Sequence, residues 1–260
     1  MPVPSLERFR GFYSNLFVVP KKGGVRPILD LKALNSFVKV QRFRMESVRS
    51  IMASLHQGDF MASLDIMDAY LHVPVCTSHQ RYLRFAIGED HYQFVALPFG
   101  LASAPRVFTK VLAPILALLR QRGIAIVGYL DDLLLRASSG SELEEDVSIT
   151  CRTLQEFGWF LNLRKSVLVP SQRLEHLGLV LDSGETKVFL PSQNLLTLQS
   201  AVRQLLTQKW SSLRFCMRVL GLMVASFEAV LYAQSTPGYY RRRFCHDGTG
   251  SHLLWITRFG

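Results

Sequence analysis

The spacing of apolar and polar residues changes along the chain, and each spacing predicts a different kind of element. Apolar residues three or four positions apart predict helices, which we expect at 46–55, 104–122, 142–157, 192–208 and 212–232. Short apolar runs bounded by turn residues predict strands, which we expect at 16–20, 25–31, 60–66, 82–87, 91–96, 159–163 and 174–181. Ser141 and Glu144 form a capping-box pattern before the third helix, and Ser103 is placed to cap the second.

Two adjacent aspartates interrupt the apolar run at residues 124–135. Apolar residues on both sides predict a strand, a tight turn and a second strand, with Asp131 and Asp132 at the turn. Adjacent carboxylates repel each other, and a divalent cation that prefers hard oxygen ligands, such as Mg²⁺, would relieve the repulsion. Taken alone, such a pair is more often a solvated hairpin tip, because aspartate favours turns.

Two further stretches carry candidate chemistry. Asp65 ends the apolar strand expected at 60–66, where it is placed to be a metal ligand at a sheet edge or the cap of a following helix. The hairpin expected at 16–31 presents Lys21, Lys22 and Arg26 near a turn with two glycines. Such a hairpin is suited to fold over phosphates, although a solvated tip explains it equally well.

Charge is distributed unevenly along the 260 residues, whose formal net charge is +10. Residues 1–50 carry ten Lys and Arg against three Asp and Glu, and residues 201–260 carry eight against two. Residues 51–150 carry seven against eleven, while residues 151–200 are nearly balanced at five against four. An acidic middle between basic ends suits a metal-bearing centre flanked by surfaces that bind a polyanion, with ordinary solubilising charge as the alternative.

The cysteines and the longest apolar stretch indicate the compartment. The four cysteines are widely separated and have no Cys-x-x-Cys spacing, so neither a zinc site nor a disulfide framework is predicted. The apolar stretch 213–232 contains Arg214, Arg218 and Glu228 and is therefore not expected to span a membrane. We expect an intracellular protein without a membrane partner; the sequence does not separate cytoplasm from nucleus.

Several motifs occur in an order and spacing that resemble those of reverse transcriptases. The ordered motifs are Asp65 with Asp68-Ala69-Tyr70, Leu97-Pro98-Phe99-Gly100 with Ala104-Pro105, Tyr129-Leu130-Asp131-Asp132, Lys165 and His176-Leu177-Gly178. The opening Gly11-Phe12-Tyr13-Ser14 and the segment 17–35 are most similar to retrotransposons of the DIRS type, with gypsy-type elements and retroviruses more distant. The resemblance covers roughly residues 11–232.

The resemblance implies an α+β fold shaped as a right-hand polymerase. The fingers would take residues 1–39 and 73–103. The palm, a ferredoxin-like antiparallel sheet plus helices, would take 40–72 and 104–190. A short helical thumb would take 191–235, and residues 236–260 form a tail to which the resemblance assigns no fold.

The same resemblance implies an RNA-directed DNA polymerase that uses two Mg²⁺ ions, with Mn²⁺ as a substitute. Asp65 and Asp131 would bridge both ions, and Asp132 would lie nearer the ion on the primer side. The carbonyl of Ile66 would contact the ion on the nucleotide side. Lys165 would protonate the departing pyrophosphate, although a surface lysine is a comparable explanation.

Further residues match the family's nucleotide and primer contacts. Lys21 and Arg26 would bind the triphosphate, and the backbone amides of Asp68 and Ala69 would add donors. Tyr70 would exclude a ribose 2′-hydroxyl. Phe99 stands where retroviral enzymes carry glutamine, so we expect apolar packing there. The primer end would be positioned by Tyr129, Leu130, His176, Leu177 and Gly178.

The partners implied are an RNA or DNA template with its primer, deoxynucleoside triphosphates, and other domains of an element polyprotein such as ribonuclease H. Two alternatives remain. One is a catalytically incomplete or domesticated copy that binds nucleic acid. The other is a different metal-dependent phosphotransferase that uses three aspartates.

Overall fold

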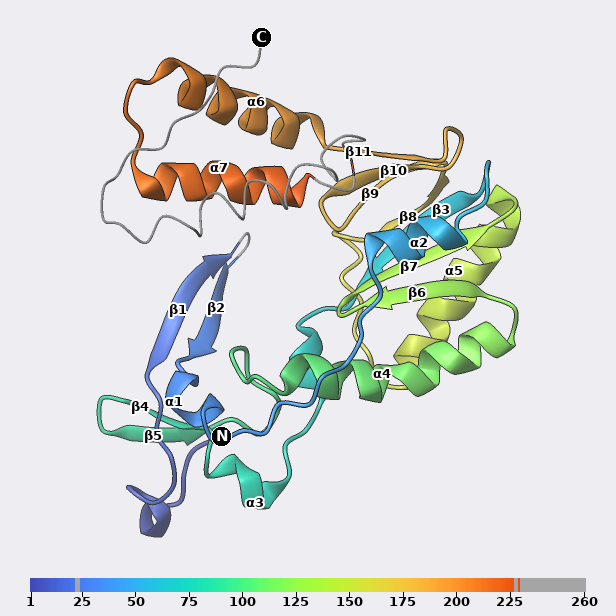
Figure 1. The fold of residues 1–260 in the computed structure, drawn as a ribbon. Helices are drawn as coiled ribbons and strands as arrows, with labels where there is room; N and C mark the ends of the chain where they lie inside the picture. Colours follow the sequence, from blue (N-terminus) through green and yellow to red (C-terminus); the bar gives the residue numbers. More distant parts are fainter. Residues whose placement is uncertain (22–23, 227–228, 230–260) are drawn as a thin grey trace. The chain divides into compact units, whose positions relative to one another are not determined.

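The computed structural model describes residues 1–21, 24–226 and 229, and Figure 1 shows how its elements follow one another. The chain divides into two compact units. One contains residues 1–177 and 183–186, and the other contains residues 178–182 and the chain from 187 onward. Each unit is described by itself. The tail expected at 236–260 and the end of the helix expected at 212–232 lie outside the described residues.

The first unit is built on a four-stranded antiparallel sheet with the strand order β6-β7-β3-β8. Its strands are β3 (Phe60–Asp65), β6 (Ala125–Tyr129), β7 (Asp132–Ala137) and β8 (Val167–Ser171). Helix α4 (Ala104–Gln121) leads into β6 and is separated from β3 by other elements at 69–93, and helix α5 (Gly140–Glu156) connects β7 to β8 (Figure 1). This order and pairing form the ferredoxin-like arrangement, which confirms the expected antiparallel sheet with helices.

The two faces of this sheet have different roles, because side chains alternate between them along each strand. One face carries the apolar residues that pack with the two helices. Leu64 of β3 and Leu133 of β7 are cross-strand partners on this face, at most 1% exposed, and share a core with Phe108 of α4. Asp65 and Asp132 are the next cross-strand pair. They therefore belong to the face opposite the helices.

Two hairpins and several short elements complete the first unit. Strands β1 (Leu16–Lys21) and β2 (Gly24–Leu29) pair antiparallel, which confirms the expected basic hairpin. Strands β4 (Arg84–Ile87) and β5 (Asp90–Gln93) form the second hairpin, also as expected. The remaining elements are η1 (Ser5–Glu7), α1 (Lys32–Asn35), α2 (Val48–Ser54), η2 (Ala69–His72), α3 (Thr77–Gln80) and β9 (Arg173–His176).

A buried arginine ties the N-terminal residues to the β4–β5 hairpin. Arg84 is 2% exposed, and its guanidinium donates to the carbonyl of Glu7 at 2.8 Å and to the side chain of Gln93 at 3.1 Å. It also donates to the carbonyl of Arg10 and pairs with the carboxylate of Glu7. Since a buried charge is tolerated only with such partners, Arg84 makes residues 7–10 part of the folded unit.

Replacing Arg84 by methionine should lower the free energy of unfolding by about 3 kcal/mol, because two carbonyls and the Gln93 amide lose a buried donor. Urea denaturation of the purified protein measures this change. Arg81→Met is the matched control, since Arg81 is exposed and contacts the ring of Tyr82. Equal losses for the two variants would contradict a structural role for Arg84.

The second unit contains a strand pair and two helices. Strands β10 (Leu179–Asp182) and β11 (Lys187–Phe189) pair antiparallel. Helices α6 (Ser192–Thr207) and α7 (Leu213–Ala225) contact each other, and Ser212 caps α7 by accepting from the amide of Phe215. They match the two helices expected from periodicity. Within the part of the chain that the structure describes, no helix is both long and apolar enough to span a membrane.

The predicted cap of α5 was wrong, and that of α4 was correct in position only. Helix α5 begins at Gly140, two residues earlier than the Ser141–Glu144 pattern predicted, and Ser139 caps it by accepting from the amide of Glu142 at 3.3 Å. The carboxylate of Glu142 in turn accepts from the hydroxyl of Ser138 at 2.8 Å, so Glu142 and not Glu144 is the acidic partner at the start of this helix. Ser103 is the N-cap residue of α4, as predicted, but its side chain makes no capping bond, because its backbone is already helical.

Two predicted strands were also wrong. Residues 159–163 form no strand; only Leu161 makes an isolated bridge, to Ile66. The strand expected at 174–181 is divided into β9 and β10, because Leu177 and Gly178 both have positive φ and form a turn. Strand β8 was missed, since Pro170 lies inside it and proline argues against a strand interior.

Candidate active site

Three aspartates meet at the end of the central sheet. Asp65 is the last residue of β3, Asp132 is the first of β7, and the two are cross-strand partners. Asp131 lies in the turn between β6 and β7, where its carbonyl accepts from the amide of Ile66 at 2.9 Å. Leu130 precedes it with φ of 54°, which a non-glycine residue adopts only at an energetic cost. Sheet pairing and a strained turn together bring the three residues to the same end of the sheet.

The carboxylates affect one another electrostatically. Burial, followed by the charges of Asp131 and Asp65, raises the pKa of Asp132 to about 6. Burial also raises the pKa of Asp131, as does Asp65, while Lys165 and Arg26 oppose this shift. The raised pKa values of Asp131 and Asp132 indicate that their negative charges are costly to hold beside each other and beside Asp65. The cluster therefore favours a neutralising cation.

A loop after α5 supports Asp65 from the side. The amide of Asn162 donates to the carbonyl of Asp65 at 2.8 Å, and the hydroxyl of Ser166 accepts from the amide of Asp65 at 3.0 Å. The same loop carries Lys165, whose Nζ is 3.5 Å from Oδ2 of Asp65. Sequence reasoning missed Asn162 and Ser166, because nothing in the local pattern indicates that this loop packs against β3.

Two rings and an arginine form a surface beside the carboxylates. The rings of Tyr70 and Phe99 have centroids 5.2 Å apart, and the guanidinium of Arg26 lies 4.6 Å from the Phe99 centroid. Tyr70 also contacts Phe108 of the core, at 5.7 Å. Burial and then the charge of Asp131 raise the pKa of Tyr70. The structure thus brings the predicted residues Arg26, Tyr70 and Phe99 together near Asp131.

Arg26 retains unused hydrogen-bonding capacity. Among the described residues its Nε is buried without a hydrogen-bond partner. A buried donor without an acceptor is unfavourable, and an anion bound over Phe99 would remove that cost. Lys21 ends strand β1, and the structure describes its backbone but not its side chain.

The other predicted site residues lie at η2, in the β6–β7 hairpin and at the end of β9. Asp68 has a left-handed backbone at the start of η2, and Ala69 is buried in the core. Tyr129 pairs with Asp132 across the β6–β7 hairpin. Burial lowers the pKa of His176 to about 4. No hydrogen bond or ion pair within the described residues joins His176 or the turn that follows it to the carboxylates.

The donor set suits a hard divalent cation, although it is not arranged around one. Among the described residues no three His, Cys, Asp or Glu side chains converge on a common metal position. Three carboxylates within electrostatic reach of one another are nevertheless the oxygen ligands that Mg²⁺ prefers. Asp65, Asp131 and Asp132 therefore fit such an ion by their chemistry.

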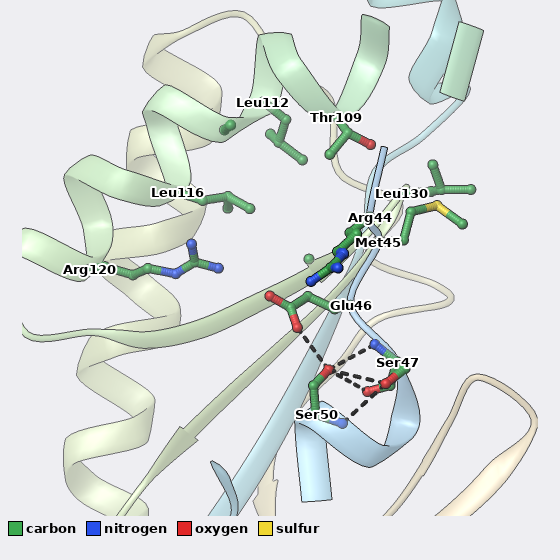
Figure 2. Close-up of a pocket in the computed structure, with 12 residues that line it drawn as sticks. Arg44, Met45, Glu46, Ser47, Ser50, Thr109, Leu112, Leu116, Arg120 and Leu130 are labelled. Atoms are coloured by element: carbon green, nitrogen blue, oxygen red, sulfur yellow. Dashed lines mark hydrogen bonds between the residues drawn. The ribbon is translucent and has the colours of Figure 1, made fainter. Parts of the chain in front are cut away.

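A cavity of about 390 Å³ lies behind the aspartate hairpin (Figure 2). Its apolar wall comes from α4, including Leu112 and Leu116, and from Leu130 of the hairpin turn. Arg44 and Glu46 approach from the segment before α2, where Glu46 accepts from the hydroxyl of Ser50 at 2.8 Å. Its lining comes from three separate segments, which is why sequence reasoning did not find it.

The sequence was compared with known protein families and curated proteins. The family model described as "Reverse transcriptase (RNA-dependent DNA polymerase)" matches residues 19–181. A Tf2-3 transposon polyprotein of Schizosaccharomyces pombe is 26% identical over 157 residues, which is 60% of this chain and 12% of the polyprotein. The Pol polyprotein of the gypsy transposon of Drosophila melanogaster is 25% identical over 183 residues, 68% of this chain and 17% of that protein. The chain thus spans less than a fifth of the length of these relatives.

Solved structures show the same fold. The foamy viral protease-reverse transcriptase in complex with double-stranded DNA matches with a TM-score of 0.76 at 21% identity, over 94% of this chain and 41% of that one. The same viral protein in complex with an RNA/DNA hybrid matches with a TM-score of 0.68 at 21% identity, over 82% and 27%. These matches confirm the expected polymerase fold. With its family model matched over more than half its length, the chain belongs to the reverse transcriptase (RNA-dependent DNA polymerase) family.

Proposed function

We propose that this chain is the polymerase domain of a retrotransposon reverse transcriptase, with the DIRS type as the closest subtype. It would transfer a nucleotidyl group from a deoxynucleoside triphosphate to a primer 3′-hydroxyl, releasing pyrophosphate. The observation that carries the proposal is the meeting of Asp65, Asp131 and Asp132 beside the Arg26–Phe99–Tyr70 surface. Like-charged carboxylates next to a free cationic donor suit a site for metal and triphosphate.

We assign the functional regions along the same lines as the family. The fingers would be residues 1–39 and 73–103, which include both hairpins. The palm would be 40–72 and 104–190, which include the central sheet. The thumb would be 191–235, of which the structure describes helices α6 and α7.

The carboxylates of Asp65, Asp131 and Asp132, with the carbonyl of Ile66, would hold two divalent cations, Mg²⁺ or Mn²⁺ in its place. When bound, these ions would lower the pKa of the attacking hydroxyl and neutralise charge on the leaving oxygens. The chain's contribution is to fix Asp65 and Asp132 on paired strands, with Asp131 in the adjoining turn, before substrate arrives. Such preorganisation avoids a reorganisation cost during the reaction.

Binding of the nucleotide is proposed to use the surface beside the carboxylates. Arg26 would donate to the triphosphate with the nitrogen that has no partner among the described residues, assisted by Lys21 and the amides of Asp68 and Ala69. Phe99 would pack against the base or sugar, and Tyr70 would leave no space for a ribose 2′-hydroxyl. Lys165, whose Nζ is 3.5 Å from Oδ2 of Asp65, would give a proton to pyrophosphate.

The proposed macromolecular partners are a primer annealed to an RNA or DNA template. The foamy viral proteins matched above were solved with double-stranded DNA and with an RNA/DNA hybrid. Tyr129, Leu130, His176, Leu177 and Gly178 would position the primer end. The curated relatives are polyproteins several times longer than this chain, so ribonuclease H would come from another segment.

Primer extension tests the proposal directly. The purified protein is incubated with poly(rA)–oligo(dT), thymidine triphosphate and Mg²⁺ or Mn²⁺, with a chelator in a parallel reaction. We expect extension that the chelator abolishes. Tight binding to the duplex without extension under either metal would favour the nucleic-acid-binding alternative and contradict a self-sufficient polymerase.

The exposed segment before α2 is expected to contribute to nucleic-acid binding. Arg44 lines the cavity next to Leu130, and Lys39 and Arg42 lie in the same exposed stretch. Arg44→Ala should weaken primer–template binding about 3- to 10-fold and reduce the slope of log affinity against log salt by about one. Fluorescence anisotropy at several salt concentrations measures both quantities. Arg152→Ala on α5 serves as control and should change neither; equal effects would exclude a specific phosphate contact at Arg44.

A further inference from the structure

Lys165 is held next to Asp65 by the loop that carries it. Its Nζ lies 3.5 Å from Oδ2 of Asp65, while Asn162 and Ser166 fix the loop to the backbone of that aspartate. The lysine side chain is 63% exposed, whereas the side chain of Asp65 is 12% exposed. The loop backbone is therefore anchored, but the ammonium reaches the carboxylate from solvent on a flexible stem.

The charge of Lys165 acts on the whole cluster. It lowers the pKa of both Asp131 and Asp132, in opposition to burial and to the neighbouring carboxylates. A single ammonium thus partly balances three negative groups. Among the described residues the three carboxylates do not converge on one metal position. Asp65 is paired with Lys165.

We propose that Lys165 is an internal counter-ion of the metal-free site, and that a divalent cation must displace its ammonium from Asp65 in order to bind. This inference rests on the proposed metal site. In the displaced state the carboxylate of Asp65 exchanges a monovalent partner for a divalent one, and the exposed stem lets the ammonium turn towards solvent or an incoming triphosphate. Lys165 then sets the metal concentration at which the site fills.

The proposal predicts a gain of metal affinity when the ammonium is removed. Lys165→Met should bind Mn²⁺ about 3- to 10-fold more tightly than the parent, since the competing ion pair is lost and such partly exposed pairs are weak. Lys165→Arg keeps a cation and should stay within about twofold of the parent. Arg164→Met removes the same charge from the neighbouring exposed position and should also stay within about twofold.

The measurement is Mn²⁺ titration followed by electron paramagnetic resonance of the free ion, with no nucleotide and no nucleic acid present. Asp131→Asn identifies the binding that belongs to the carboxylates. Equal affinities of Lys165→Met and Arg164→Met would overturn the counter-ion role while leaving the metal site intact. If Asp131→Asn binds Mn²⁺ as tightly as the parent and Lys165→Met do, the binding does not belong to the carboxylates. The proposed metal site then fails, and the exchange fails with it.

Thermal unfolding gives a second readout that does not require a metal affinity to be measured. In a chelator, Lys165→Met should unfold at a lower temperature than Arg164→Met, because its carboxylates have lost their counter-ion. Added Mn²⁺ should then raise the melting temperature of Lys165→Met by more than that of the parent. A melting temperature of Lys165→Met in chelator equal to that of Arg164→Met would contradict the proposal.

Discussion

Asp131→Asn should reduce primer extension by at least about 1,000-fold while leaving the fold and nucleic-acid binding intact. Asparagine keeps the shape of the side chain but removes the charge that a divalent cation needs. The structure predicts no loss of stability, because burial and Asp65 raise the pKa of Asp131 and its charge is unfavourable in the folded state. At neutral pH the free energy of unfolding should be unchanged or higher.

Three measurements on the same preparation separate catalysis from folding: extension rate on poly(rA)–oligo(dT), duplex affinity by anisotropy, and urea denaturation. Asp90→Asn is the matched control, since it makes the same chemical change at an exposed residue of the β4–β5 hairpin. It should extend the primer at the parent rate. Extension by Asp131→Asn within tenfold of the parent would refute the assignment of this residue to the metal site.

Tyr70→Ala should let the protein use ribonucleotides, improving their incorporation relative to deoxynucleotides by about 100-fold. The ring is fixed in place, because it contacts Phe99 on one side and Phe108 of the core on the other. A fixed ring cannot move aside for a 2′-hydroxyl, so its removal opens space next to the sugar. The ratio of kcat/KM for the two nucleotides on one template measures the change.

Tyr70→Phe separates the ring from its hydroxyl. It keeps both ring contacts and removes only the group whose pKa Asp131 and burial raise. We expect its sugar discrimination to equal that of the parent. If Tyr70→Ala also discriminates like the parent, while remaining folded and active with deoxynucleotides, Tyr70 has a packing role and the gate lies elsewhere.

Local sequence signals predicted most of the fold. The basic hairpin could be predicted because two apolar runs flank a short sequence with two glycines, and turn signals of this kind act over only a few residues. Helices α4 to α7 followed from apolar periodicity in the same way. The errors lie where local signals compete. Neighbouring serines offered two caps for α5, and Pro170 concealed β8.

The candidate site could be predicted only in part. The ordered motifs identified Asp65, Asp131 and Asp132, and pairing of β3 with β7 brings these residues together. The ion pair of Lys165 with Asp65 joins residues about a hundred positions apart, and only the folded loop creates it. The stacking of Arg26 on Phe99 likewise joins residues that are far apart in the sequence. Such contacts depend on tertiary structure, which single-sequence patterns do not encode.

The pairing of Asp65 with Asp132 across two strands has a consequence for how this chain can change over time. A one-residue insertion or deletion within β3 or β7 would move one carboxylate to the helix-covered face, since side chains alternate. Insertions in the connecting loops leave that pairing untouched. Length changes in this chain should therefore be tolerated in the loops and selected against inside these two strands, because only the latter separate the paired carboxylates.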